Sequence, residues 1–159
     1  MYTKQFEIRW SDVDANLHLR NSAYIDYMSH TRMSYFQEKG FNQNRLHELQ
    51  LGPVALYEHM FYFQEVFPGK PISVSLQLKG VSEDGSFFSF VHNFYDAKGK
   101  NLARCEMLGA WINLNTRKLT HPPQELWDFL DEMDKTEDYK TITKEDTRKF
   151  GQVPKDLSL

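Results

Sequence analysis

The segment Asn21–Lys39, NSAYIDYMSHTRMSYFQEK, decides the fold because it is the only long helical pattern before residue 120. Its buried stripe is marked by residues that recur at spacings of three and four. These residues are Tyr24, Tyr27, Met28, Thr31 and Tyr35. Asn21 or Ser22 can cap the helix at its start, and Gly40 stands where a helix end favours a positive φ. We therefore expect one long helix in this part of the chain.

Extended segments surround this helix and are separated by short turns. Lys4–Trp10 precedes it, and Pro53–Phe67 follows it as two strands or one bent strand. Three more segments come next: Ile72–Lys79, Phe87–Tyr95 and Leu102–Leu114. The first of these alternates apolar and polar residues, whereas the second is apolar on both faces and is expected to be central. Turns as short as Asp96–Gly99 allow only antiparallel pairing.

The order of these elements is one strand, one long helix and then a run of strands. This order predicts an α+β domain in which an antiparallel sheet wraps around one long central helix. We assign residues 1–120 to this domain. Residues 121–159 are expected to add a short helix, Gln124–Met133, and a polar tail that packs on the same domain or extends from it.

The composition fits a single folded domain of 159 residues and excludes several classes of protein. A net charge of −3 gives no broad basic face for nucleic acid or for an anionic membrane. Cys105 is the only cysteine, so an intrachain disulfide is impossible, and no apolar run reaches the length of a membrane helix. We therefore expect a soluble, cytoplasmic protein. The 12 Phe, 8 Tyr and 3 Trp residues suit a strand-rich core or an apolar ligand tunnel.

Polar side chains gather between the first strand and the helix, in the segment Trp10–Asn21, WSDVDANLHLRN. The start of a helix offers unpaired backbone N–H groups and a positive dipole end, which can hold an oxyanion or a polarised carbonyl. Asp14 and His18 lie four residues apart in this segment and supply a carboxylate and an imidazole. Such a pair suits general-base or nucleophilic catalysis, but Asp, Asn and Ser before a helix also serve as caps and turn residues.

The segment Ile8–Tyr24, together with the helix after it, resembles the signature of hotdog-fold acyl thioesterases. In the 4-hydroxybenzoyl-CoA thioesterase type, the second Asp of an Asp-x-Asp pair is catalytic, and Asp14 stands at that position. The acyl-ACP thioesterase type reads Asp-x-Asn-x-His-x-x-Asn, which is the closer match. Its four positions are held here by Asp14, Asn16, His18 and Asn21. The resemblance covers roughly residues 4–120 and implies the hotdog fold.

The chain departs from these families at two positions. Many CoA-type members have glycine before the histidine, where this chain has Leu17. The acyl-ACP type carries a Glu-Cys pair on a later strand, and Glu65-Val66 aligns with it, so the carboxylate is kept and the thiol is not. The acyl-ACP enzymes also carry two hotdog units in one chain, so this chain matches only their catalytic half.

The resemblance implies hydrolysis of an acyl thioester of coenzyme A or of acyl carrier protein, with no metal and no bound cofactor. Asp14 is expected to act as base on a water molecule or as nucleophile. Asn16 and His18 would orient water or stabilise the oxyanion, and Glu65 would assist as a second carboxylate. The expected substrate-binding residues are Asn21, Tyr24 and Arg32. Structural roles stay open for three of these residues: helix packing for Tyr24, an ion pair for Arg32 and a solvated strand end for Glu65.

Two other functions of the same fold stay open. One is a non-catalytic hotdog domain that binds acyl-CoA or packs as a structural partner, and the presence of Asp14 argues against it. The other is a hydratase, whose Asp and His typically lie within the central helix rather than before it. We also expect a homodimer or homotetramer, since a hotdog sheet leaves edge strands exposed and family members commonly join two sheets edge to edge. The aromatic residues favour an apolar acyl group over acetyl.

Overall fold

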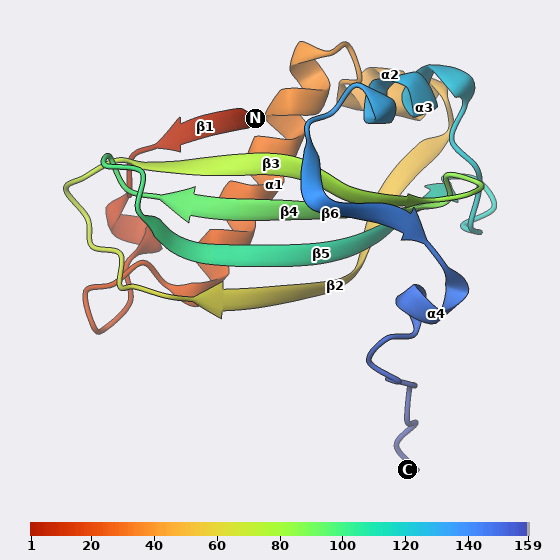
Figure 1. Ribbon diagram of the computed structural model, residues 1–159. Helices are drawn as coiled ribbons and strands as arrows, with labels where there is room; N and C mark the ends of the chain where they lie inside the picture. Colours follow the sequence, from red (N-terminus) through yellow and green to blue (C-terminus); the bar gives the residue numbers. More distant parts are fainter. Residues whose placement is uncertain (159) are drawn as a thin grey trace.

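The computed structural model describes residues 1–158, so Leu159, the last residue of the predicted polar tail, lies outside the described residues. The helix α1, Asn21–Glu38, lies along one face of a curved sheet (Figure 1), which confirms the central helix. The other helices are short: the 3-10 helix Trp10–Asp12 and the α-helices α2, Gln43–Glu48, α3, Gln124–Asp131, and α4, Lys144–Thr147. None of the described helices is long and apolar enough to span a bilayer.

The sheet of the described chain has six strands: β1, Tyr2–Phe6, β2, Leu51–Tyr62, β3, Ile72–Ser82, β4, Phe87–Tyr95, β5, Asn101–Asn113, and β6, Lys135–Ile142. Five of them run antiparallel in the order β1-β3-β4-β5-β2, and β6 pairs with β3 in parallel. The strand β4 is therefore central, as its two apolar faces predict, and β2 lies at an edge. This arrangement confirms the α+β class with one antiparallel sheet around one long helix.

The strand boundaries differ most from the predicted ones at the ends of β1 and β2. The strand β1 ends at Phe6 rather than at Trp10, because the chain turns there into the 3-10 helix that opens the polar segment. The segment Pro53–Phe67 forms a single strand, β2, which ends at Tyr62 and has one bulge after Ala55. Because the residues after Tyr62 leave the sheet, they are free to approach the polar segment before α1.

The polar C-terminal residues contain a strand that the sequence analysis missed. The strand β6 lies beside the half of β3 that β1 leaves uncovered, and Lys79 of β3 forms an ion pair with Asp138 of β6 at 3.0 Å. Most of β6 is polar and exposed, so its sequence has no apolar alternation to reveal it. Farther along, the ring of Phe150 packs on His59 of β2 with ring centres 4.2 Å apart. The tail therefore crosses the outer face of the sheet (Figure 1).

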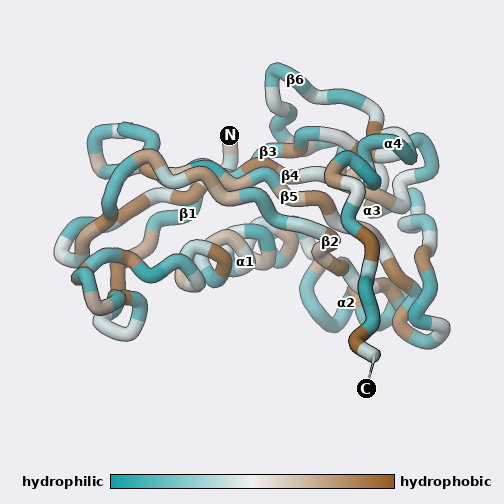
Figure 2. The backbone as a smooth tube through the Cα atoms, turned by 90° about the horizontal axis from the view of Figure 1, so that it is seen from below, coloured by the Kyte–Doolittle hydropathy of each residue, from teal (hydrophilic) through white to brown (hydrophobic). Residues whose placement is uncertain are grey.

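Two buried apolar clusters lie between α1 and the sheet, and Figure 2 shows hydrophobic positions along these elements. Phe88, Phe90 and Phe94 of β4 belong to these clusters and are 2%, 1% and 0% exposed. Their rings fill the space between helix and sheet. These three rings of β4 therefore serve packing rather than the ligand tunnel that the composition also allowed.

Candidate active site

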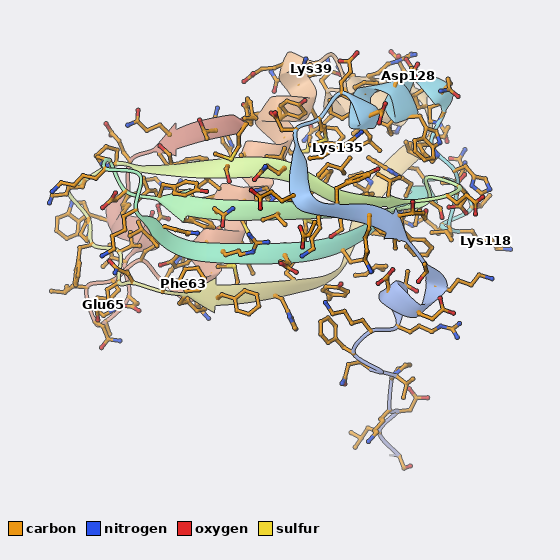
Figure 3. All side chains as sticks on the ribbon, viewed as in Figure 1. Lys39, Phe63, Glu65, Lys118, Asp128 and Lys135 are labelled. Atoms are coloured by element: carbon orange, nitrogen blue, oxygen red, sulfur yellow. The ribbon has the colours of Figure 1, made fainter. Side chains whose placement is uncertain are left out.

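A cavity of about 380 Å³ opens where the polar segment before α1 meets the end of β2. Its walls come from the polar segment, from the first turns of α1 and from residues 62–66. Figure 3 shows two of these residues, Phe63 and Glu65, at the end of β2. Five of the seven predicted site residues line the cavity: Asp14, His18, Asn21, Tyr24 and Glu65. The fold thus brings together residues that are far apart in the sequence.

Residues 14–18 form a tight turn that carries two of these side chains. The N–H of Asp14 donates to the carbonyl of His18 at 2.9 Å, and the N–H of Leu17 donates to the carbonyl of Asp14 at 3.1 Å. Leu17 has a φ of 64°, the left-handed conformation that a three-residue hairpin loop of this type needs there. Leu17 therefore adopts the backbone conformation that glycine would adopt at this position. A non-glycine residue in this conformation costs roughly 1–2 kcal/mol.

The carboxylate of Asp14 is fixed by the same turn. Its Oδ1 accepts the N–H of Asn16 at 2.8 Å and the N–H of His18 at 3.2 Å. Its Oδ2 takes part in neither bond, and the residue lines the cavity. Asp14 therefore stabilises the turn, as the sequence allowed, through Oδ1. Its other carboxylate oxygen, Oδ2, remains available for chemistry.

Three contacts join this turn to the residues that follow β2. The N–H of Leu19 donates to the carbonyl of Val66 at 2.7 Å. The Nε2 of His18 lies 3.2 Å from Oε1 of Glu65, and the His18 ring packs edge-on against Phe67 with ring centres 4.9 Å apart. Glu65 is thus outside the strand in which the sequence placed it, and its exposed carboxylate pairs with the imidazole instead of facing an aromatic sheet surface.

The first residue of α1, Asn21, lines the same cavity. The prediction that Asn21 or Ser22 caps the helix was wrong, because Arg20 holds the capping position and its side chain makes no capping hydrogen bond. Instead, Oδ1 of Asn21 accepts the N–H of Ser22 at 2.9 Å. The N–H of Ala23 donates to the carbonyl of Arg20 at 3.0 Å, so the N–H of Asn21 is the one at this helix start with no hydrogen-bond partner among the described residues and can meet an anionic ligand. The positive end of α1 therefore lies at the cavity wall.

Tyr24 forms an inner wall of the cavity. It is 3% exposed and packs edge-on against Tyr62 and Phe94, with ring centres 5.1 and 5.0 Å away. Burial raises the pKa of Tyr24 to about 12, so its hydroxyl stays protonated at neutral pH and can donate a hydrogen bond. Tyr62 also lines the cavity, and the sequence analysis did not single it out. Alternation along β2 could have found it, because Met60 and Tyr62 share one face.

Two predicted site residues are not among the described residues that line the cavity. Asn16 stands at the exposed tip of the turn. Arg32 is largely buried, with Nη1 lying 3.1 Å from Nε2 of His92 and Nη2 donating to Oγ of Ser29 at 3.0 Å. Burial, followed by the charge of Arg32, lowers the pKa of His92 to about 3, so this ring is neutral and accepts from Arg32. These contacts are structural, and a substrate contact by Arg32 stays a prediction.

Asp12, the first Asp of the Asp-x-Asp pair, is fully buried at 0% exposure. Its carboxylate accepts bonds of 2.8 and 2.9 Å from the guanidinium of Arg9 and one of 2.6 Å from the hydroxyl of Tyr27. These bonds, above all those from Arg9, hold the pKa of Asp12 at about 2 despite its burial. The family resemblance gives a catalytic role to the second Asp, Asp14, and the sequence offered no role for Asp12.

The family model of the thioesterase-like superfamily matches residues 8–130. The chain therefore belongs to the thioesterase-like superfamily, which confirms the resemblance read from the segment before α1. Membership supports thioester hydrolysis as the general class of activity. Comparison with curated proteins gives no match.

Solved structures similar to this chain share its fold at low sequence identity. A 1,4-dihydroxy-2-naphthoyl-CoA thioesterase from Synechocystis is 14% identical with a TM-score of 0.74, covering 82% of this chain and 96% of its own. A DHNA-CoA thioesterase from Staphylococcus aureus is 14% identical with a TM-score of 0.72, covering 81% and 85%. A hypothetical protein from Staphylococcus aureus, in complex with CoA, is 17% identical with a TM-score of 0.73, covering 97% and 94%.

Proposed function

We propose that this protein hydrolyses acyl thioesters of coenzyme A or of acyl carrier protein. The observation that carries the proposal is that Asp14 and the start of α1 at Asn21 meet in one cavity. A thioester bound there would have its carbonyl oxygen at backbone donors and its carbonyl carbon near a carboxylate. Acyl transfer needs both elements, an oxyanion site and an oxygen base or nucleophile.

In the proposed reaction, Asp14 acts through the carboxylate oxygen that its turn leaves unused. It removes a proton from a water molecule that attacks the thioester carbon, or it attacks that carbon itself to give an anhydride that water opens. In both routes, the oxyanion is stabilised by N–H groups near Asn21, and its collapse expels the thiolate. The imidazole of His18, paired with Glu65, orients the water, with Asn16 beside it at the tip of the turn.

The acyl group in this proposal is apolar. Tyr24 and Tyr62 supply aromatic walls, and Phe63 adds a third ring to the lining. Contact with these rings removes methylene groups from water, which stabilises binding by about 0.8 kcal/mol for each one buried. Coenzyme A is the carrier favoured by likeness to the structure determined in complex with CoA, while the loop motif resembles the acyl-ACP type more closely.

The active form in this proposal is a homodimer or a homotetramer. The strand β2 has β5 as its neighbour on one side only, and its cavity end carries exposed rings, Phe61 and Tyr62. An open strand edge beside exposed aromatic side chains favours pairing with another strand. Light scattering tests this part directly, and a stable, active monomer would contradict it.

A thiol-release assay on a panel of acyl-CoA and acyl-ACP thioesters tests the activity itself. We expect turnover of medium-chain or aromatic acyl groups without added metal. The competing function, a domain that binds acyl-CoA without cleaving it, predicts a different result. It gives heat of binding in calorimetry with the same acyl-CoA and no release of thiol over hours.

A further inference from the structure

We propose that Asp12 is the positioning residue that sets the place of Asp14 relative to α1. This inference rests on the proposed function, because it concerns the carboxylate assigned there to the chemistry. Asp12 does not line the cavity as described, so its contribution would pass through the turn that begins two residues later. The three contacts described above tie the turn to residues 65–67, so its link to α1 must come from other groups.

A second turn in the same chain provides the comparison. Residues 96–100, DAKGK, repeat the hydrogen bonds of residues 14–18, DANLH. The N–H of Asp96 donates to the carbonyl of Lys100 at 3.0 Å, and the N–H of Gly99 donates to the carbonyl of Asp96 at 3.0 Å. Oδ1 of Asp96 accepts the N–H groups of Lys98 and Lys100 at 2.8 and 2.9 Å. The two turns therefore share one local geometry.

The two turns differ in the strand pairing that adjoins them. Residues 96–100 join β4 and β5, which pair along most of their length from Tyr95 and Asn101 onward, with one register shift after Phe94. The turn at 14–18 stands on one isolated bridge, between Val13 and Leu19, within the described chain. A single bridge leaves the orientation of a turn poorly fixed, because a strand pair without a continuing ladder is marginal. Other contacts must therefore hold the turn that carries Asp14.

Asp12 makes the contacts that reach α1. Its carbonyl accepts the N–H of Arg20 at 2.8 Å, which is one of the two hydrogen bonds of the bridge between Val13 and Leu19, so its carboxylate provides the additional contact. Its carboxylate accepts the hydroxyl of Tyr27, which lies in the second turn of the helix. Hydrogen bonds to a buried charge are stronger than those between neutral groups. Through Asp12, the turn and the start of α1 therefore share one rigid connection.

The exchange of Tyr27 for Phe tests this role with a minimal change. Tyr27→Phe removes the hydroxyl that binds Asp12 and keeps the aromatic packing. Tyr35→Phe is the matched control, because Tyr35 is also buried on α1 and lies at its other end, against Phe129. We expect Tyr27→Phe to lower kcat about tenfold with KM within about twofold of the wild type, and Tyr35→Phe to leave both unchanged.

A double-mutant cycle separates positioning from general stability. If Tyr27 acts through Asp14, then Tyr27→Phe has less than about a twofold effect on kcat in an Asp14→Asn background. Effects that multiply in the double variant, or a kcat unchanged by Tyr27→Phe alone, would overturn the inference.

Amide hydrogen exchange gives a readout that does not need activity. We expect the N–H groups of Asp14 and His18 to exchange at least about tenfold faster in Tyr27→Phe. Those of Asp96 and Lys100, in the matching turn, should keep their rates. Equal protection of both turns in the variant would contradict the role of Asp12. Absence of thioester turnover by the wild type would contradict the proposed function instead. The amide hydrogen exchange rates would still show whether Asp12 holds the turn in position.

Discussion

Leu17 and Gly99 hold the same left-handed backbone conformation, with φ angles of 64° and 79°, in two turns of matching hydrogen bonds. Glycine takes this conformation freely, whereas leucine does not. The side chain of Leu17 is 64% exposed, so little packing is lost when it is removed. The pair therefore allows the energetic effect of the backbone conformation to be measured in both directions within one protein.

We expect the exchange Gly99→Leu to lower the free energy of unfolding by about 1–2 kcal/mol, because it places a side chain on a left-handed backbone. Leu17→Gly relieves this strain but adds freedom to the unfolded chain, so we expect a change of less than about 1 kcal/mol. Urea unfolding of both variants measures the difference. A loss above about 2 kcal/mol in Leu17→Gly would mean that the exposed side chain makes a contact that the turn geometry does not account for.

The exchange Asp14→Asn separates chemistry from turn formation. Asparagine keeps an oxygen that can accept the N–H groups of Asn16 and His18, so we expect the melting temperature to stay within a few degrees. The loss of the carboxylate should lower kcat by at least about 100-fold, the scale of general-base contributions. Asp96→Asn makes the same change in the matching turn and should leave kcat unaltered. Turnover near the wild-type rate in Asp14→Asn would remove this residue from the mechanism.

Sequence patterns predicted those parts of the fold that rest on local periodicity. The stripe of α1 and the two apolar faces of β4 are such patterns, and both elements are where the sequence places them. The strand β6 has no apolar alternation, because it lies at a sheet edge with its side chains mostly in solvent. The short helix α2 buries a single residue, Leu46, and so gives no repeating signal either.

The candidate site was predictable only in part, because local spacing does not show which distant segments come together. The motif before α1 placed Asp14 and His18 near a helix start, because all three lie within a few residues of one another. The pairing of His18 with Glu65 depends on where the chain leaves β2, and strand patterns do not mark that point. Alternation along β2 places Tyr62 on the same face as Met60, but it does not show whether the end of that face borders a cavity or the core.

Glu65 supports His18 in the proposed mechanism through the 3.2 Å contact between Oε1 and Nε2. The exchange Glu65→Ala removes this partner and should lower kcat about tenfold, since the imidazole is then held only by its contact with Phe67. Glu65→Gln keeps an oxygen that accepts from Nε2 and should retain most of the activity. Steady-state kinetics on the best acyl-CoA compare the two variants. Equal activity of Glu65→Ala and the wild type would show that this pair is not needed.

Asp12 should make the free energy of unfolding depend on pH in the range below about pH 4. Its pKa in the folded protein is about 2, below the ordinary value of 3.8, with the bonds from Arg9 as the main cause. The folded state therefore binds this proton less tightly than the unfolded state, so the stabilisation is present above about pH 4 and is lost as the pH falls through about 2. We expect Asp12→Asn to melt at a lower temperature than the wild type at pH 7. The two melting curves should converge between about pH 4 and pH 2, and curves that stay parallel would contradict this origin.

Two neighbouring rings on β2, Tyr62 and Phe61, should differ in their effect on the choice of acyl group. Tyr62 lines the cavity and contacts Tyr24, whereas successive residues of a strand face opposite sides, so Phe61 faces away from α1. Both side chains are about half exposed, at 53% and 45%, so either can be removed without opening the core. We expect Tyr62→Ala to lower kcat/KM for octanoyl-CoA about tenfold and to change it little for acetyl-CoA, because only the longer chain reaches the ring. Phe61→Ala is the matched control and should leave both values near those of the wild type, compared at a protein concentration where light scattering gives both variants the oligomeric state of the wild type. The six additional methylene groups of octanoyl can contribute at most about 5 kcal/mol, so a clear preference of the wild type for octanoyl over acetyl is part of the same prediction. A flat profile across acyl lengths, or an equal loss in both variants, would mean that these rings pack against protein and do not select the substrate.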